Sequence, residues 1–180
     1  MAPEVVVIAT GGVGVTPVLP GIALPRVADV RDWLERRPTV PTGETVTIWG
    51  ADRVGLAAAD AIATGGAAVL LVGAQAEIAP EAGRREKILA VPRLQANPRV
   101  QILLGATVEV IDEHRILVGR AGHREWLQVT GPVLVSQGIA PDGPGLRVGD
   151  RPTYVIGEAG FGASADDAIR EGATAGRAIR

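Results

Sequence analysis

Short apolar runs recur along the chain, and a glycine or a polar residue follows each of them. Runs that are apolar at nearly every position are typical of strands buried on both faces, as in the centre of a parallel sheet. On this basis the sequence predicts strands at residues 3–10, 45–49, 68–72, 100–104, 132–136 and 153–156.

Two other patterns fill most of the intervals between these runs. Apolar residues spaced by three and four positions, such as Val30, Trp33 and Leu34, predict helices, at residues 28–37, 56–64, 84–95 and 164–180. Alternation of apolar and polar residues predicts short strands at 107–111, 114–118 and 124–129. Stretches rich in glycine and proline predict loops at 13–26 and 137–152 and a linker at 38–43.

The order of these elements predicts an α/β fold. Residues 45–104 read as strand, turn, helix, strand, helix and strand, which is one mononucleotide-binding half of a Rossmann-like domain. Three antiparallel strands then precede the apolar strand at 132–136. The sequence therefore predicts a three-layer domain at 43–137 with a three-stranded antiparallel excursion, inserted into a partial second domain made of residues 1–42 and 138–180.

Composition and charge exclude several classes of protein. With 47% hydrophobic and 21% charged residues the chain is not intrinsically disordered. A net charge of −2 and a pI of about 5.7 provide no basic field for nucleic acid. Every apolar run is far shorter than the roughly 18 residues that span a bilayer, and no leader pattern stands at the start. We therefore expect a cytoplasmic protein that binds neither nucleic acid nor membrane.

The chain has no cysteine and only two histidines, His114 and His123. Disulfides, iron–sulfur clusters, thiolate zinc sites and cysteine nucleophiles are thereby excluded within it. Two histidines in a polar stretch do not make a metal site, so we expect no metal ligands. The 24 glycines, in contrast, indicate tight turns and close backbone approach, which dinucleotide sites require.

The first candidate site is the turn after the strand at 45–49, where Gly50 and Gly55 bracket the start of a helix. A dinucleotide fingerprint places a third glycine between them, where the backbone touches the pyrophosphate. Asp52 stands at that position. Its carboxylate either repels the phosphates of a ligand or turns away and caps the helix.

The end of the second strand does not decide between NAD and NADP. An NAD site usually has an acidic residue there for the ribose hydroxyls, but the first acid after the strand is Glu77. Arg84 and Arg85 could meet a 2′-phosphate, or simply be solvated. The choice of cofactor stays open.

Two weaker motifs flank the inserted domain. One is a strand that ends in Thr10, Gly11 and Gly12; the other is the later sequence Gly157-Glu158-Ala159, followed by acidic residues that favour a helix start at 166–167.

In this order, the three motifs resemble the two-dinucleotide-binding-domain flavoproteins. The chain is similar to the C-terminal module of the Old Yellow Enzyme-related NADH:flavin oxidoreductases, which include 2,4-dienoyl-CoA reductase and the trimethylamine and histamine dehydrogenases. The similarity covers essentially all 180 residues, with Glu158 in place of the family's aspartate.

The resemblance implies that FAD (or ADP) and NAD(P)H bind to this module and that hydride passes from the nicotinamide to FAD. Electrons would then pass through an iron–sulfur cluster to FMN, both of which lie in the remainder of such enzymes. No catalytic residue is expected in the chain. The cofactor-binding residues that it implies are Thr10, Gly11, Gly12, Gly50, Ala51, Asp52, Gly55, Gly157, Glu158, Ala159 and Asp167.

The chain also departs from the family pattern. The family's first FAD-binding unit, the FMN barrel and the cluster cysteines have no counterpart in the sequence. We therefore expect a fragment or split subunit that pairs with the rest of a flavoenzyme or with a second copy, and that is inactive alone. The alternative is a non-catalytic structural or regulatory domain that keeps the fold but binds nucleotide poorly.

Overall fold

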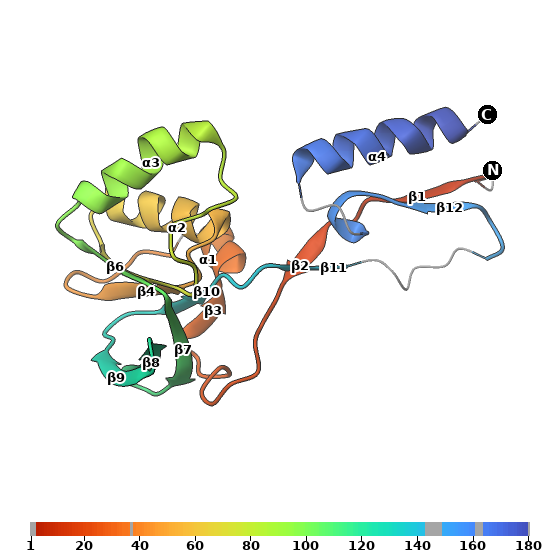
Figure 1. Cartoon of the computed structure of the whole chain (residues 1–180). Helices are drawn as coiled ribbons and strands as arrows, with labels where there is room; N and C mark the ends of the chain where they lie inside the picture. The colour runs from red at the N-terminus through yellow and green to blue at the C-terminus, as the bar shows by residue number, and fades with distance from the viewer. Residues whose placement is uncertain (1–2, 37, 143–148, 161–163, 180) are drawn as a thin grey trace. The chain divides into compact units, whose positions relative to one another are not determined.

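The computed structural model describes residues 3–36, 38–142, 149–160 and 164–179. The chain divides into two compact units (Figure 1): the larger unit is Thr16–Gly138, and the smaller unit combines Met1–Val15 with Ile139–Arg180.

A five-stranded parallel sheet forms the centre of the larger unit, in the order β3-β10-β4-β5-β6. Its strands are β3 (Val27–Asp29), β4 (Thr45–Trp49), β5 (Ala68–Gly73), β6 (Val100–Leu104) and β10 (Val133–Val135). The register pairs Thr47 of β4 with Leu70 of β5 and with Val133 of β10. The predicted βαβαβ series is thus confirmed as part of a parallel sheet.

Helices cover one face of this sheet, and a small antiparallel sheet covers the other. The helices are α1 (Val30–Arg36), α2 (Arg53–Thr64) and α3 (Arg84–Ala96); the antiparallel strands are β7 (Ala106–Ile111), β8 (Arg115–Arg120) and β9 (His123–Gln128). Because successive side chains of a strand point to opposite faces, β4 contributes side chains to the hydrophobic cores on both faces of the sheet. Ile48 packs in the core beneath the helices, and Trp49 packs against the antiparallel sheet.

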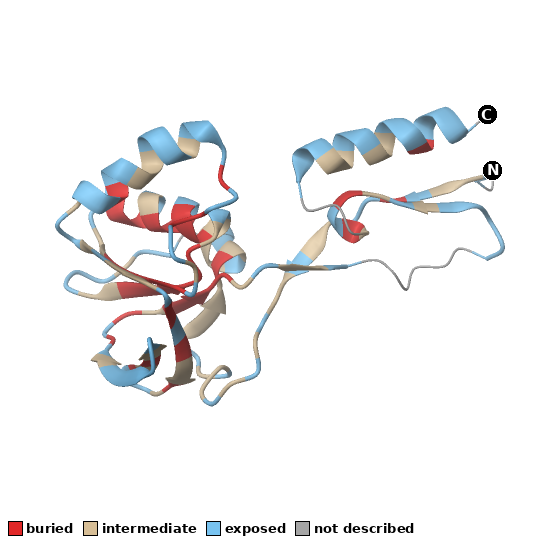
Figure 2. Cartoon of the chain, in the orientation of Figure 1, coloured by how far each residue is buried: buried red, intermediate tan, exposed pale blue. Residues whose placement is uncertain are grey.

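Helix α2 lies deepest of the three helices. It buries Leu56 and Ile62, together with small residues that allow the helix to pack closely on the sheet. Helix α3 contains Pro92 and buries only Leu94 among its described residues. Figure 2 shows this difference as red segments along α2 and mostly pale blue segments along α3.

The smaller unit contains two short strand pairs and a helix. Strand β1 (Val6–Ile8) pairs in parallel with β12 (Thr153–Val155), and β2 (Gly12–Gly14) pairs antiparallel with β11 (Ile139–Pro141). A 3₁₀ turn, η1 (Gly157–Ala159), leads to helix α4 (Ala165–Ala178), with Ser164 as its N-cap.

Three predictions for this part of the chain differ from the structure. The strand predicted at 3–10 covers only Val6–Ile8, and Val7 remains 44% exposed because β12 is the one strand of the described residues that pairs with it. The loop predicted at 13–26 overlaps β2, and the loop predicted at 137–152 contains β11; both strands are too short to give a period of their own. Residues 143–148 of the second predicted loop lie outside the described residues.

The compact units also differ from the predicted domain limits at one segment. Residues 16–42 were expected with the split domain, but they belong to the larger unit. The reason is that β3 pairs in parallel with β10 and that Val30 of α1 is fully buried in the same core. Among the described helices, none is long and apolar enough to cross a membrane.

Candidate functional site

The turn between β4 and α2 is built on two glycines that tolerate no side chain. Gly50 has φ of +131°, and a Cβ on it would lie 1.7 Å from the carbonyl oxygen of Ser136. A Cβ on Gly55 would lie 1.9 Å from the carbonyl oxygen of Gly50. Backbone approach this close fixes the helix directly after the strand, which is the geometry that a dinucleotide fingerprint requires.

Ala51 fills the space beneath this turn. It is fully buried, and a Cβ on Gly73, the last residue of β5, would lie 2.4 Å from its own Cβ. Its carbonyl oxygen accepts a hydrogen bond of 2.7 Å from the backbone N–H of Ala79. The segment that follows β5 is therefore tied to the glycine turn.

Asp52 caps α2, which confirms one of the two alternatives that the sequence left open. Its Oδ1 accepts a hydrogen bond of 2.7 Å from the backbone N–H of Gly55 and another of 2.6 Å from the hydroxyl of Ser136. These bonds satisfy an N–H that would otherwise lack a partner in the first helical turn. They also join the start of α2 to the end of β10.

A second carboxylate, from Glu81, lies at the same helix end. Its Oε1 accepts a hydrogen bond of 2.6 Å from the backbone N–H of Arg53, the first residue of α2. Sequence reasoning missed Glu81, because nothing in the local pattern shows that the segment after β5 folds back onto α2. The sequence offers no signal for this contact beyond the two glutamates, Glu77 and Glu81, that follow β5.

The side chain of Arg53 is bound to the beginning of α3. Its guanidinium Nη2 lies 2.7 Å from Glu86 Oε1. The pKa of Glu86 lies below its ordinary value, first because its own backbone N–H donates to the carboxylate and second because Arg53 does. Arg53 is thus held at both its backbone and its side chain by the residues that precede and begin α3.

The hydrogen bonds that Asp52 and Glu81 accept determine which donors this turn offers to the pyrophosphate of a dinucleotide. A pyrophosphate at such a helix end is bound by the backbone N–H groups of the first turn and by the positive end of the helix dipole. Here the N–H groups of Arg53 and Gly55 already donate to the carboxylates of Glu81 and Asp52. The fold of the site fits a dinucleotide, but its phosphate-binding donors, as arranged in this structure, do not.

The other predicted residues lie in the smaller unit, where they follow two paired strands. Gly11 has φ of +81°, and a Cβ on it would meet no atom of the described residues within 4 Å. A Cβ on Gly12 would lie 2.3 Å from the side chain of Ile139, so Gly12 allows β2 and β11 to pack. The hydroxyl of Thr10 donates to the carbonyl oxygen of Asp142.

Gly157 and its neighbours follow β12. The backbone N–H of Ile156 donates to the carbonyl oxygen of Ile8 at 2.9 Å, so both motifs leave the same end of the parallel pair. Gly157 is buried with φ of +64°, and Ala159 is buried too, whereas Glu158 is exposed. The structure thus brings the Thr10–Gly12 motif and the Gly157–Ala159 motif to one edge of a sheet.

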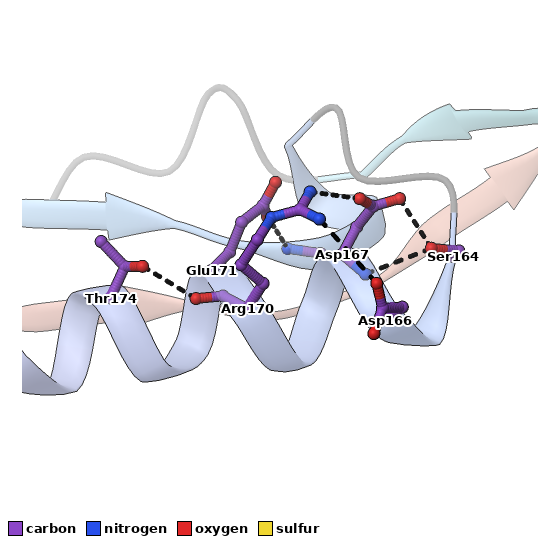
Figure 3. A network of polar contacts seen from close by, with 7 residues as sticks. Ser164, Asp166, Asp167, Arg170, Glu171 and Thr174 are labelled. Carbon is purple, nitrogen blue, oxygen red and sulfur yellow. Dashed lines mark hydrogen bonds and ion pairs between the residues drawn. The ribbon is translucent and has the colours of Figure 1, made fainter.

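Carboxylates also accept hydrogen bonds at the start of this second motif and at the start of the helix that follows it (Figure 3). Glu171 of α4 accepts a hydrogen bond of 2.7 Å from the backbone N–H of Gly157. At the start of α4, Asp167 accepts from the hydroxyl of Ser164 at 2.7 Å and forms an ion pair with Arg170. Of the three predicted site glycines in this unit, Gly11 has an open Cβ position among the described residues, whereas a Cβ on Gly12 or Gly157 would lie within 3.2 Å of another residue.

No family model and no curated protein matches the sequence. Solved structures do match. A 2-naphthoyl-CoA reductase in complex with 2-naphthoyl-CoA aligns with a TM-score of 0.86 and 26% identity, over 99% of this chain and 27% of that one. Histamine dehydrogenase from Rhizobium sp. 4-9 aligns with a TM-score of 0.81 and 22% identity, over 98% of this chain and 30% of that one. The NAD-dependent persulfide reductase from A. fulgidus aligns with a TM-score of 0.68 and 22% identity, over 98% and 39%.

The chain has the fold of a flavoprotein nucleotide-binding module. The expected likeness to the Old Yellow Enzyme-related reductases and dehydrogenases is confirmed, because the reductase and the dehydrogenase align over nearly all of this chain. The chain spans less than a third of the length of either of these two proteins.

Proposed function

We propose that the chain is the nucleotide-binding module of an NAD(P)H-dependent flavin oxidoreductase. One observation carries this proposal: the strand ends at Gly11 and Gly157 lie at one sheet edge in a unit whose sequence is split by an α/β insertion. The alignment with 2-naphthoyl-CoA reductase over 99% of the chain supports the same reading. The parent protein would then be an enzyme, with a cytoplasmic location.

The chain's own residues would bind and orient a nucleotide rather than transfer protons. Gly11 fits this role, because its left-handed backbone and the open space around it allow the close approach of a ligand. A bound FAD would supply the redox chemistry. Thr10, Gly11 and Gly12, with Gly157, Glu158, Ala159 and Asp167, would hold FAD or ADP, and no residue of this set is assigned an acid or base role.

A second candidate function is a structural or regulatory domain with weakened nucleotide binding. The specific observation that favours it is that the N–H groups of Arg53 and Gly55, at the NAD(P)-type turn, donate to carboxylates of the chain itself. Under this alternative neither unit would bind a nucleotide in the isolated chain.

Calorimetric titration of the 180-residue chain with FAD and with ADP tests the proposal. We expect binding of at least one of them, and we expect Gly11→Ala to weaken it by about tenfold because the new Cβ occupies the open surface. Gly43→Ala is the matched control: Gly43 also has positive φ, +90°, and an equally open Cβ position. Absence of binding to either nucleotide, or equal weakening by both variants, would contradict the proposal.

A further inference from the structure

The loop after β5 places a carboxylate where a ligand phosphate would lie. In folds of this type the N–H groups at the start of the first helix face the pyrophosphate. At that position the N–H of Arg53 donates to Glu81 Oε1 at 2.6 Å. A carboxylate shares with phosphate a negative charge and several acceptor oxygens, and both are stabilised by the positive end of a helix.

Packing and hydrogen bonds fix the segment that carries Glu81. Ile78, Ala79 and Ala82 are buried in the core beneath the helices. The N–H of Ala79 donates to the carbonyl oxygen of Ala51 at 2.7 Å, and the Lys87 ammonium donates to the carbonyl oxygen of Pro80 at 2.7 Å. The carboxylate of Glu81 is therefore held at the helix end by a folded segment and not by a free loop.

We propose that Glu81 is an internal substitute for the ligand phosphate and restricts nucleotide binding at this turn. A pyrophosphate-bearing nucleotide and the carboxylate compete for the N–H of Arg53, and their like charges exclude simultaneous binding. A nucleotide binds there only when Glu81 is displaced. The inference rests on the proposed function, since it assumes that the turn after β4 is of the nucleotide-binding type.

Asp52 does not have the same role. Its carboxylate turns toward Gly55 and Ser136 and completes the cap, so its removal would harm the helix as well as change the charge. Glu81 makes only the bond to Arg53 among the described residues. Its replacement therefore frees the donor while the cap on α2 stays in place.

The test is a titration of the full ¹⁵N-labelled chain with ADP, followed through the backbone amide signals of Arg53 and Val54. The variants are Glu81→Ala, which frees the donor, and Glu81→Gln, which keeps the size of the side chain but removes its charge. Glu77→Gln is the matched control, because Glu77 lies exposed in the same segment and has no hydrogen bond or ion pair among the described residues. Circular dichroism checks that each variant is folded.

We expect both Glu81 variants to bind ADP at these amides at least about tenfold more tightly than the unchanged chain, and Glu77→Gln to match the unchanged chain. Equal affinity in the unchanged chain and the Glu81 variants, or no response at Arg53 in any of them, would overturn the proposal. The amide signals of Gly11 and Gly157 report separately on the smaller unit. Their silence counts against the proposed function, and silence at Arg53 alone counts against the role of Glu81.

Discussion

At the scale of single residues, the departure of the turn from the glycine fingerprint has a structural explanation. Asp52 replaces the glycine that would face a phosphate, and its carboxylate accepts from the N–H of Gly55 and the hydroxyl of Ser136. The sequence allowed capping as one of two interpretations, since aspartate is a preferred N-cap residue. Ser136 could not be predicted, because it lies 84 positions along the chain from Asp52.

Replacement of Asp52 should therefore destabilise the larger unit. We expect Asp52→Ala to lower the free energy of unfolding by about 1–2 kcal/mol, because the Gly55 N–H loses its cap and the hydroxyl of Ser136 loses its acceptor. Asp52→Asn keeps an acceptor oxygen and should retain most of the stability. Urea unfolding followed by circular dichroism measures the three proteins; no loss of stability in the Asp52→Ala variant would show that the cap contributes nothing.

At the scale of elements, the sequence predicted the strands with a longer hydrophobic pattern better than the very short strands. Strands β4 and β6 begin and end at the predicted residues, because each is a mostly apolar run that a charged residue precedes and a glycine follows. Strands β2 and β11 have three residues each, which is too short for a period to show, and only their pairing identifies them. The position of Glu81 was unpredictable for a similar reason, since it depends on how a loop folds back onto α2.

The two longer helices of the larger unit differ in how firmly they are packed, and this has a measurable consequence. Because α3 buries only Leu94 and α2 buries a whole face, we expect amides of α3 to exchange with deuterium faster than those of α2. Leu94→Ala should speed exchange in α3 further, since the loss of a buried leucine costs about 2–5 kcal/mol. Ile88→Ala is the control, because Ile88 is 55% exposed; faster exchange in α2 than in α3 would contradict the prediction.

At the scale of the whole molecule, the smaller unit is short of strand neighbours. Its parallel sheet has two strands among the described residues, and sheets of that size are rarely stable alone. Apolar side chains stay exposed on it, Val7 at 44% and Val155 at 40%, and Ile169 of α4 is 72% exposed. Val155 is the register partner of Ile8, the residue after Val7. Val7 and Val155 therefore lie on opposite faces of the strand pair. We propose that either the rest of a flavoenzyme or a second copy of the chain covers these exposed side chains.

We predict that the chain associates at micromolar concentration. Burial of a few hundred Å² of apolar surface contributes several kcal/mol at roughly 25 cal/mol per Å², before the cost of association is subtracted. Multi-angle light scattering should give a mass above the 18.5 kDa of one chain. The double variant Val7→Lys with Val155→Lys should lower that mass, whereas Ile88→Lys on α3 should not. A mass of one chain for the unchanged protein would refute the prediction.

The order of strands in the larger sheet has a consequence for synthesis on the ribosome. Strand β10 lies between β3 and β4, although it is the last of the five to be made. Until Val133–Val135 leaves the exit tunnel, β3 has no partner and β4 presents unpaired N–H and C=O groups along one edge. The sheet of the nascent chain therefore lacks the strand between β3 and β4 for most of translation. Strand β10 must then insert between these two strands rather than pair with an edge of the sheet. Strand pairs so distant in sequence fold slowly, so the emerging polypeptide would need shielding from other chains during that interval.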